Sequence, residues 1–177
     1  MAKKIISQLE LIDSLLNHEF LEKGKDATQL VETGLMKRRL VLNGLDHRLY
    51  RYDADKSDFF RYFSMTSGLK KMCDYILFIE ESSRLYILLI ELKLGTKSAT
   101  KQLVASECFI DFLLASAGRV GIHLKANCHT MKIRVSEERS KQRNRTTRQE
   151  PLIYDVNRII NYDRKDAFRI KEVLGVI

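Results

Sequence analysis

Two nearly continuous runs of apolar residues in the middle of the chain constrain the fold more than any other feature. They lie in residues 74–80 and 85–93, which we predict to be two strands joined by the polar residues 81–84. A strand that is apolar on both faces is covered on both sides, as in the centre of a layered sheet. The chain is therefore expected to contain a central sheet with a layer packed on each face.

The rest of the chain alternates between helical and strand patterns. Helices are predicted at residues 5–22, 27–36, 98–117 and 164–174, and strands at 129–135 and 152–156. Residues 38–52 read as a hairpin around the turn signal Asn43-Gly44, whereas 57–63 fit a short helix or a strand. In the third helix Ser98 is the expected N-cap, and the expected buried stripe comprises Ala105, Phe109, Phe112, Leu113 and Ala117. This order predicts an α/β fold, a three-layer sandwich with a mixed central sheet flanked by helices.

Composition bounds the class of protein. With 177 residues the chain is expected to form a single domain, residues 1–177. Three scattered cysteines indicate a reducing compartment, so we expect a cytoplasmic protein. The longest apolar run, residues 85–90, excludes a membrane span, and the N-terminal residues do not resemble a secretory signal. The net charge of +8 suits a polyanionic partner such as nucleic acid.

Polar residues end both apolar strands. If the hairpin folds about the Ser82-Ser83 step, Asp74 lies opposite Glu91, with their Cβ atoms about 4.5–5.5 Å apart, and Lys93 lies on the same face. Opposed like charges destabilise a sheet unless a cation lies between them, and carboxylate oxygens suit Mg²⁺ or Mn²⁺. Lys93 would then stabilise a developing anion or help to deprotonate a metal-bound water. The alternative is that Lys93 simply forms an ion pair with Glu91.

The same residues carry a resemblance to a known family. Asp74, then sixteen residues, then Glu91-Leu92-Lys93 at the end of an apolar strand and an amphipathic helix resembles the PD-(D/E)xK nuclease superfamily. The resemblance implies a restriction-endonuclease-like αβββαβ core. It also implies that Asp74 and Glu91 bind the metal, that Lys93 assists the attacking water, and that Gln102 supports the site. Cys73 departs from the family pattern, where a proline often stands.

The resemblance also implies an acidic residue on the first helix. The sequence does not choose among the candidates, which are Glu10, Glu19 and Glu32.

Basic residues near these positions are candidates for phosphate contact, which gives salt-sensitive affinity without sequence preference. Four of them flank the proposed site in sequence: Lys70, Lys71, Lys97 and Lys101. Five more lie in the polar segment 137–150, which we read as a loop: Arg139, Lys141, Arg143, Arg145 and Arg148. A zinc site at His123, Cys128 and His129 is not favoured, because the spacings match no zinc template.

Together these features predict a Mg²⁺- or Mn²⁺-dependent endonuclease that acts on nucleic acid, by resemblance DNA rather than RNA. Without its own sequence-reading domain, its choice of target would come from DNA structure, from the partner in a homodimer or from a larger assembly, such as one for DNA processing or phage defence. Two alternatives remain open. One is a catalytically silent nucleic-acid-binding or scaffold subunit, and the other is an RNA-cleaving toxin.

Overall fold

The computed structural model describes residues 7–31, 39–52, 66, 69–82, 84–94, 97–124, 128–137, 158–162 and 167–175. Within these ranges the helices are α1 (Gln8–Leu15), α2 (Thr100–Arg119) and α3 (Ile170–Leu174), with a 3-10 turn, η1 (Asp26–Thr28). The strands are β1 (Gln29–Val31), β2 (Arg39–Asn43), β3 (His47–Arg51), β4 (Tyr75–Glu81), β5 (Arg84–Leu94), β6 (Cys128–Glu137), β7 (Ile159–Tyr162) and β8 (Ala167–Arg169).

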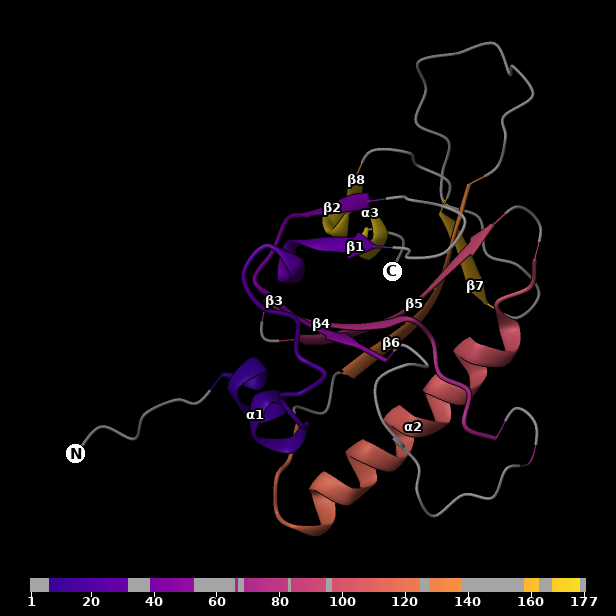
Figure 1. Cartoon of the computed structure of the whole chain (residues 1–177). Helices are drawn as coiled ribbons and strands as arrows, with labels where there is room; N and C mark the ends of the chain where they lie inside the picture. Colours follow the sequence, from indigo (N-terminus) through magenta and orange to yellow (C-terminus); the bar gives the residue numbers. More distant parts are fainter. Residues whose placement is uncertain are drawn as a thin grey trace.

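The strands form two mixed sheets. The larger, here called sheet A, has the order β3-β4-β5-β6-β7, with antiparallel pairing up to β5 and parallel pairing beyond it. The smaller, sheet B, has the order β1-β2-β8. Figure 1 shows α1 and α2 below sheet A, and sheet B with α3 above it. The chain is therefore a mixed α/β protein in three layers, but its third layer is mainly a second sheet instead of helices.

The central hairpin forms in the predicted register. Ile76 pairs with Leu89 and Phe78 pairs with Ile87. Alternation along β4 directs Ile76 and Phe78 into the core under α1 and α2, whereas Leu77 enters the core under sheet B. Because both faces of these strands are covered, continuous apolar sequence is what this position requires.

The strands predicted in residues 38–52 are confirmed, but their pairing as a hairpin is wrong. β2 belongs to sheet B and β3 to sheet A, so the turn at Asn43-Gly44 carries the chain from one layer to the next. Gly44 has φ +142°, and a Cβ atom there would lie 3.2 Å from the Cβ of Ile170. The glycine therefore permits both the backbone conformation and the close approach of α3.

Three predicted helices also differ from the structure. The first ends at Leu15, because Leu16 is extended and the following turns bring Leu21 into a bridge with Tyr50. Residues 26–31 form η1 and β1 where a second helix was predicted. In the last, residues 167–169 pair with β2 as a strand, and the helix of the described part is Ile170–Leu174, whereas residues 164–166 lie outside the described ranges. Pairing with a neighbouring strand overrides the local helical pattern in both of these segments. The predicted segments 32–36, 57–63 and 152–156 lie outside the described residues.

Helix α2 lies where it was predicted, but it is rotated. Phe112 is 60% exposed, and the buried face consists of Leu103, Ser106, Ile110, Leu113 and Ala117. Ala99, and not Ser98, is the N-cap residue, although the Ser98 hydroxyl accepts a hydrogen bond from the Thr100 N–H at 3.2 Å. No helix within the described ranges has the length and apolar character needed to cross a membrane.

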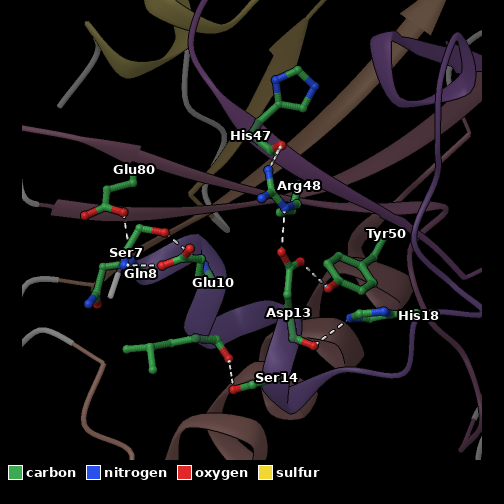
Figure 2. Close-up of polar contacts among 11 residues, drawn as sticks. Ser7, Gln8, Glu10, Asp13, Ser14, His18, His47, Arg48, Tyr50 and Glu80 are labelled. Carbon is green, nitrogen blue, oxygen red and sulfur yellow. Dashed lines mark hydrogen bonds and ion pairs between the residues drawn. The ribbon is translucent and has the colours of Figure 1, made fainter. Parts of the chain in front are cut away.

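Polar contacts fix α1 against sheet A (Figure 2). The Gln8 N–H, at the start of the helix, donates to the Glu80 carboxylate at 2.7 Å. Near its end, the Asp13 carboxylate accepts from Arg48 Nε at 2.7 Å and from the buried Tyr50 hydroxyl at 3.1 Å. Asp13 thus joins α1 to two alternate positions of β3, Arg48 and Tyr50.

Replacing Asp13 by alanine is expected to lower the free energy of unfolding by about 1–3 kcal/mol, because the Tyr50 hydroxyl loses its acceptor in a buried position. Urea denaturation followed by circular dichroism measures the change. Glu19→Ala is the control, since Glu19 is exposed and, in the described part of the chain, forms its hydrogen bonds with Asn17. Equal stabilities of the two variants would show that Asp13 does not hold α1 in place.

Candidate active site

The two carboxylates meet where the pairing of β4 with β5 ends. The last pair in the ladder is Tyr75 with Ile90, one step before Asp74 and Glu91. Beyond this pair, the two carboxylates accept hydrogen bonds from backbone N–H groups. The Asp74 N–H donates to Glu91 Oε2 at 3.1 Å, and the Leu92 N–H donates to Asp74 Oδ2 at 2.7 Å. Each carboxylate is therefore held by the backbone of the opposite strand.

Lys93 completes a charged cluster at the same end of the β4–β5 hairpin. Its Nζ forms an ion pair with Glu91 Oε1. The ion pair given above as the alternative to a metal site is therefore present. Asp74 adds a second carboxylate, and two carboxylates with one ammonium leave a net charge of −1. Glu91 is only 2% exposed. Burial, and next the charge of Asp74, raise the pKa of the Glu91 carboxyl to about 7, against the opposing effect of Lys93.

This arrangement fits a hard divalent cation. Two adjacent carboxylates supply oxygen ligands, and an added cation would relieve the repulsion that raises the Glu91 pKa. Among the described residues no three His, Cys, Asp or Glu side chains gather as a metal centre. Mg²⁺ commonly binds through one or two carboxylates together with waters and substrate phosphates, so a pair is a sufficient protein contribution.

Ser106 of α2 anchors the backbone that leads into the site. Its fully buried hydroxyl accepts a hydrogen bond from the Cys73 N–H at 2.8 Å and donates to the Gln102 carbonyl at 3.0 Å. Proline has no N–H, so a proline at position 73 would lose this contact. Cys73 thus supplies a backbone N–H that the proline often found here in the family it resembles would lack, and Ser106 accepts the hydrogen bond of this N–H. The Cys73 thiol is fully buried, and burial raises its pKa to about 12, so it is a packed side chain and not a nucleophile.

The remaining predicted residues fall in three groups. Gln102 lies on the first turn of α2, joined through its carbonyl to Ser106. Lys70 and Lys71 lie shortly before Asp74 in the chain, Lys97 lies just before α2 and Lys101 on its first turn, and all but Lys70 are exposed. Arg139, Lys141, Arg143, Arg145 and Arg148 lie outside the described residues.

The candidates for an acid on the first helix do not join the carboxylate pair where they are described. Glu10 forms a capping box with Ser7, next to the Gln8 contact with Glu80 (Figure 2). Glu80 is six strand positions from Asp74, about 20 Å at the usual rise per residue. Glu19 is exposed and follows the end of α1, and Glu32 lies outside the described residues.

Two polar residues beside the site were not among the predicted ones. Arg134 of β6 is the register partner of Glu91, and Asn161 of β7 is the register partner of Arg134. The alternating pattern of β6 places Arg134 on its polar face. The register of a parallel pair joined through a helix, however, has no short-range sequence signal comparable to a hairpin turn, so its position beside Glu91 was not predictable.

Comparison of the chain with protein-family models, with curated proteins and with solved structures finds no significant match in any of the three.

Ser106→Ala is expected to lower the free energy of unfolding by about 1–3 kcal/mol, since it leaves the buried Cys73 N–H without its acceptor. Chemical denaturation measures the loss. Ser116→Ala is the matched control, because it makes the same change on the same helix in a less buried position. If both variants lose the same stability, Ser106 does not anchor the segment before Asp74.

The raised pKa of Glu91 predicts a pH-dependent stability. Its ordinary value is 4.5 and its value in the fold is about 7, so the folded state binds this proton more tightly than the unfolded state. The resulting stability is fully present below pH 4.5 and is lost as the pH rises through about 7.

In EDTA, the free energy of unfolding is therefore expected to fall from about pH 5 to about pH 8 by an amount on the order of 1–3 kcal/mol. Glu91→Gln removes the titrating group and should flatten this part of the profile, whereas the exposed control Glu19→Gln should keep it. Denaturation curves recorded at each pH give the free energy of unfolding of the three proteins. Parallel profiles for wild type and Glu91→Gln would contradict the pKa assignment.

Proposed function

We propose that this protein is a metal-dependent nuclease that hydrolyses phosphodiester bonds, with DNA as its substrate and with the PD-(D/E)xK resemblance as its family context. The observation that carries the proposal is the buried Glu91 carboxylate, held beside Asp74 and Lys93 at the end of two central strands. Burying the Glu91 carboxylate beside a second carboxylate is costly, and binding of a cation for the reaction would offset that cost.

The order of the elements supports the same proposal. α1, β3, β4, β5, α2 and β6 follow one another as α-β-β-β-α-β, with β1 and β2 inserted between α1 and β3. Asp74 directly precedes β4 and Glu91 lies in β5, and α2 is the next helix, as the resemblance implies. The net charge of +8 and the lysines on both sides of the site suit a polyanionic substrate.

Asp74 and Glu91 would hold a Mg²⁺ or Mn²⁺ ion. When bound, such an ion polarises the phosphate and lowers the pKa of water. Lys93 Nζ, now on Glu91 Oε1, would donate a hydrogen bond to the oxygen that gains charge as water attacks phosphorus. Gln102 and Ser106 keep the backbone before Asp74 in place. The reaction forms one phosphorus–oxygen bond to water and breaks the bond to the leaving sugar oxygen.

The ion pair between Lys93 and Glu91 also favours a second candidate. A subunit that binds nucleic acid without cutting it would keep the fold, the basic residues and a neutralised Glu91. This candidate predicts binding without turnover, and the cleavage assay separates it from the enzyme.

The assay compares linear, supercoiled, branched and single-stranded DNA with RNA, in Mg²⁺, Mn²⁺ or EDTA. Wild type is expected to cut DNA only with metal, and Lys93→Ala and Glu91→Gln to lose about 100-fold or more in rate, the usual cost of removing one group that stabilises transition-state charge.

Lys171→Ala is the matched control, because Lys171 is exposed on α3 in the layer above sheet A. Cutting that survives both site substitutions would refute the assignment of the site. Metal-dependent cutting of RNA alone would select the toxin instead. Binding of DNA without any cutting would select the non-cleaving subunit.

A further inference from the structure

The outward face of α2 carries a row of apolar side chains. Val104, Cys108 and Phe112 are spaced four residues apart, so they lie in one row along the helix. All three are exposed, Val104 by 42% and Phe112 by 60%. The face of α2 that packs on sheet A, with Leu103 and Ile110, already belongs to the core. A second apolar face on the same helix indicates a surface that contacts another molecule.

Two residues of opposite charge stand on the same outward face. Lys101 lies on the first turn, before the apolar row, and Asp111 lies next to Phe112, and both are exposed. No described residue forms a side-chain hydrogen bond or an ion pair with either of them. Glu107 differs, because Lys132 binds its carboxylate at 2.8 Å. The outward face therefore offers an unpaired cation on one side of Cys108 and an unpaired anion on the other.

This arrangement of charges is complementary to a second copy of itself when the two helices run antiparallel. A two-fold axis beside Cys108 places Val104 of each copy opposite Phe112 of the other. Lys101 then lies within about one turn, or 6 Å along the axis, of Asp111 in the second copy, a gap that a lysine side chain spans. Parallel helices would instead bring each charge next to its like.

Arg119, at the far end of α2, lies beyond the apolar row. Helices that pack through rows of residues four apart cross at about 50°. The two helices have therefore diverged at Arg119, and its charge stays outside the contact.

We propose that this protein forms a homodimer through the outward face of α2, with Val104, Cys108 and Phe112 at its centre and Lys101 of each copy paired with Asp111 of the other. The inference goes beyond the proposed function and does not depend on it, since neither metal nor nucleic acid takes part. A polyanion fits this face less well, because Asp111 would repel it and the apolar row offers it no hydrogen-bond donors.

Sedimentation velocity of the full chain, in reductant and without metal or DNA, measures the dimer. Wild type is expected to dimerise in the micromolar range. Val104→Asp and Phe112→Asp should raise the Kd of the dimer about 10-fold or more, because each puts a carboxylate in the apolar centre of the contact. Val41→Asp is the matched control and should dimerise like wild type. Val41 is 45% exposed, and it lies in sheet B, on the opposite side of sheet A from α2 (Figure 1).

Exchange of the two charges tests the antiparallel arrangement. Lys101→Glu and Asp111→Lys should each weaken the dimer, because each brings like charges together. The variant with both substitutions has opposite charges again and should recover the wild-type Kd. A double variant that dimerises no better than the single ones would overturn this arrangement.

Cys108 tests the contact itself, since it is exposed whereas Cys73 is buried and Cys128 partly buried. A short bismaleimide should link the two Cys108 thiols of the dimer, and Cys108→Ser should prevent the link while the protein remains dimeric. A monomeric wild type, whether or not another protein binds its α2 face, would overturn the proposal. A dimer that Phe112→Asp leaves intact and that Cys108 does not link would overturn it too. Neither result bears on the cleavage assay, so the dimer and the nuclease fail separately.

Discussion

The reciprocal hydrogen bonding of Asp74 and Glu91 with each other's strands is the contact on which the functional reading depends. Where the β4–β5 ladder stops, the Asp74 N–H is bound by Glu91 and the Leu92 N–H is bound by Asp74. The pair thus replaces lost backbone partners and at the same time places the buried Glu91 carboxylate beside the partly exposed carboxylate of Asp74. Burial, and next the repulsion between the two carboxylates, raise the Glu91 pKa, and the repulsion favours the binding of a cation.

The layers around sheet A keep this contact in place. α1 is fixed by Asp13 at β3 and by Glu80 at the far end of β4 (Figure 2). α2 reaches the site itself, because Ser106 bonds to the residue before Asp74. On the opposite face sheet B and α3 cover the same strands (Figure 1). The site therefore lies at the ends of two inner strands of a doubly covered sheet, where charge is tolerated only when it is held by hydrogen bonds.

The pairing of strands that are adjacent in the chain was predictable from the sequence. The β4–β5 register follows from a short polar turn between two apolar runs, and it placed Asp74 by Glu91 and Lys93 on the same face. Contacts between residues that are distant in the chain were not predictable. The turn at Asn43-Gly44 resembles a hairpin, but only contact with α3 and β8 shows that it joins two sheets. Ser106 and Arg134 likewise owe their positions to long-range packing that no local period encodes.

The central claim is that the carboxylate pair binds a divalent cation. Isothermal titration of Mn²⁺ into wild type and Asp74→Asn above the Glu91 pKa of about 7 tests it most directly, with and without DNA. The account predicts a binding heat in wild type that Asp74→Asn removes while the variant keeps its circular dichroism spectrum. Equal heats in the two proteins, or none in wild type under either condition, would contradict it.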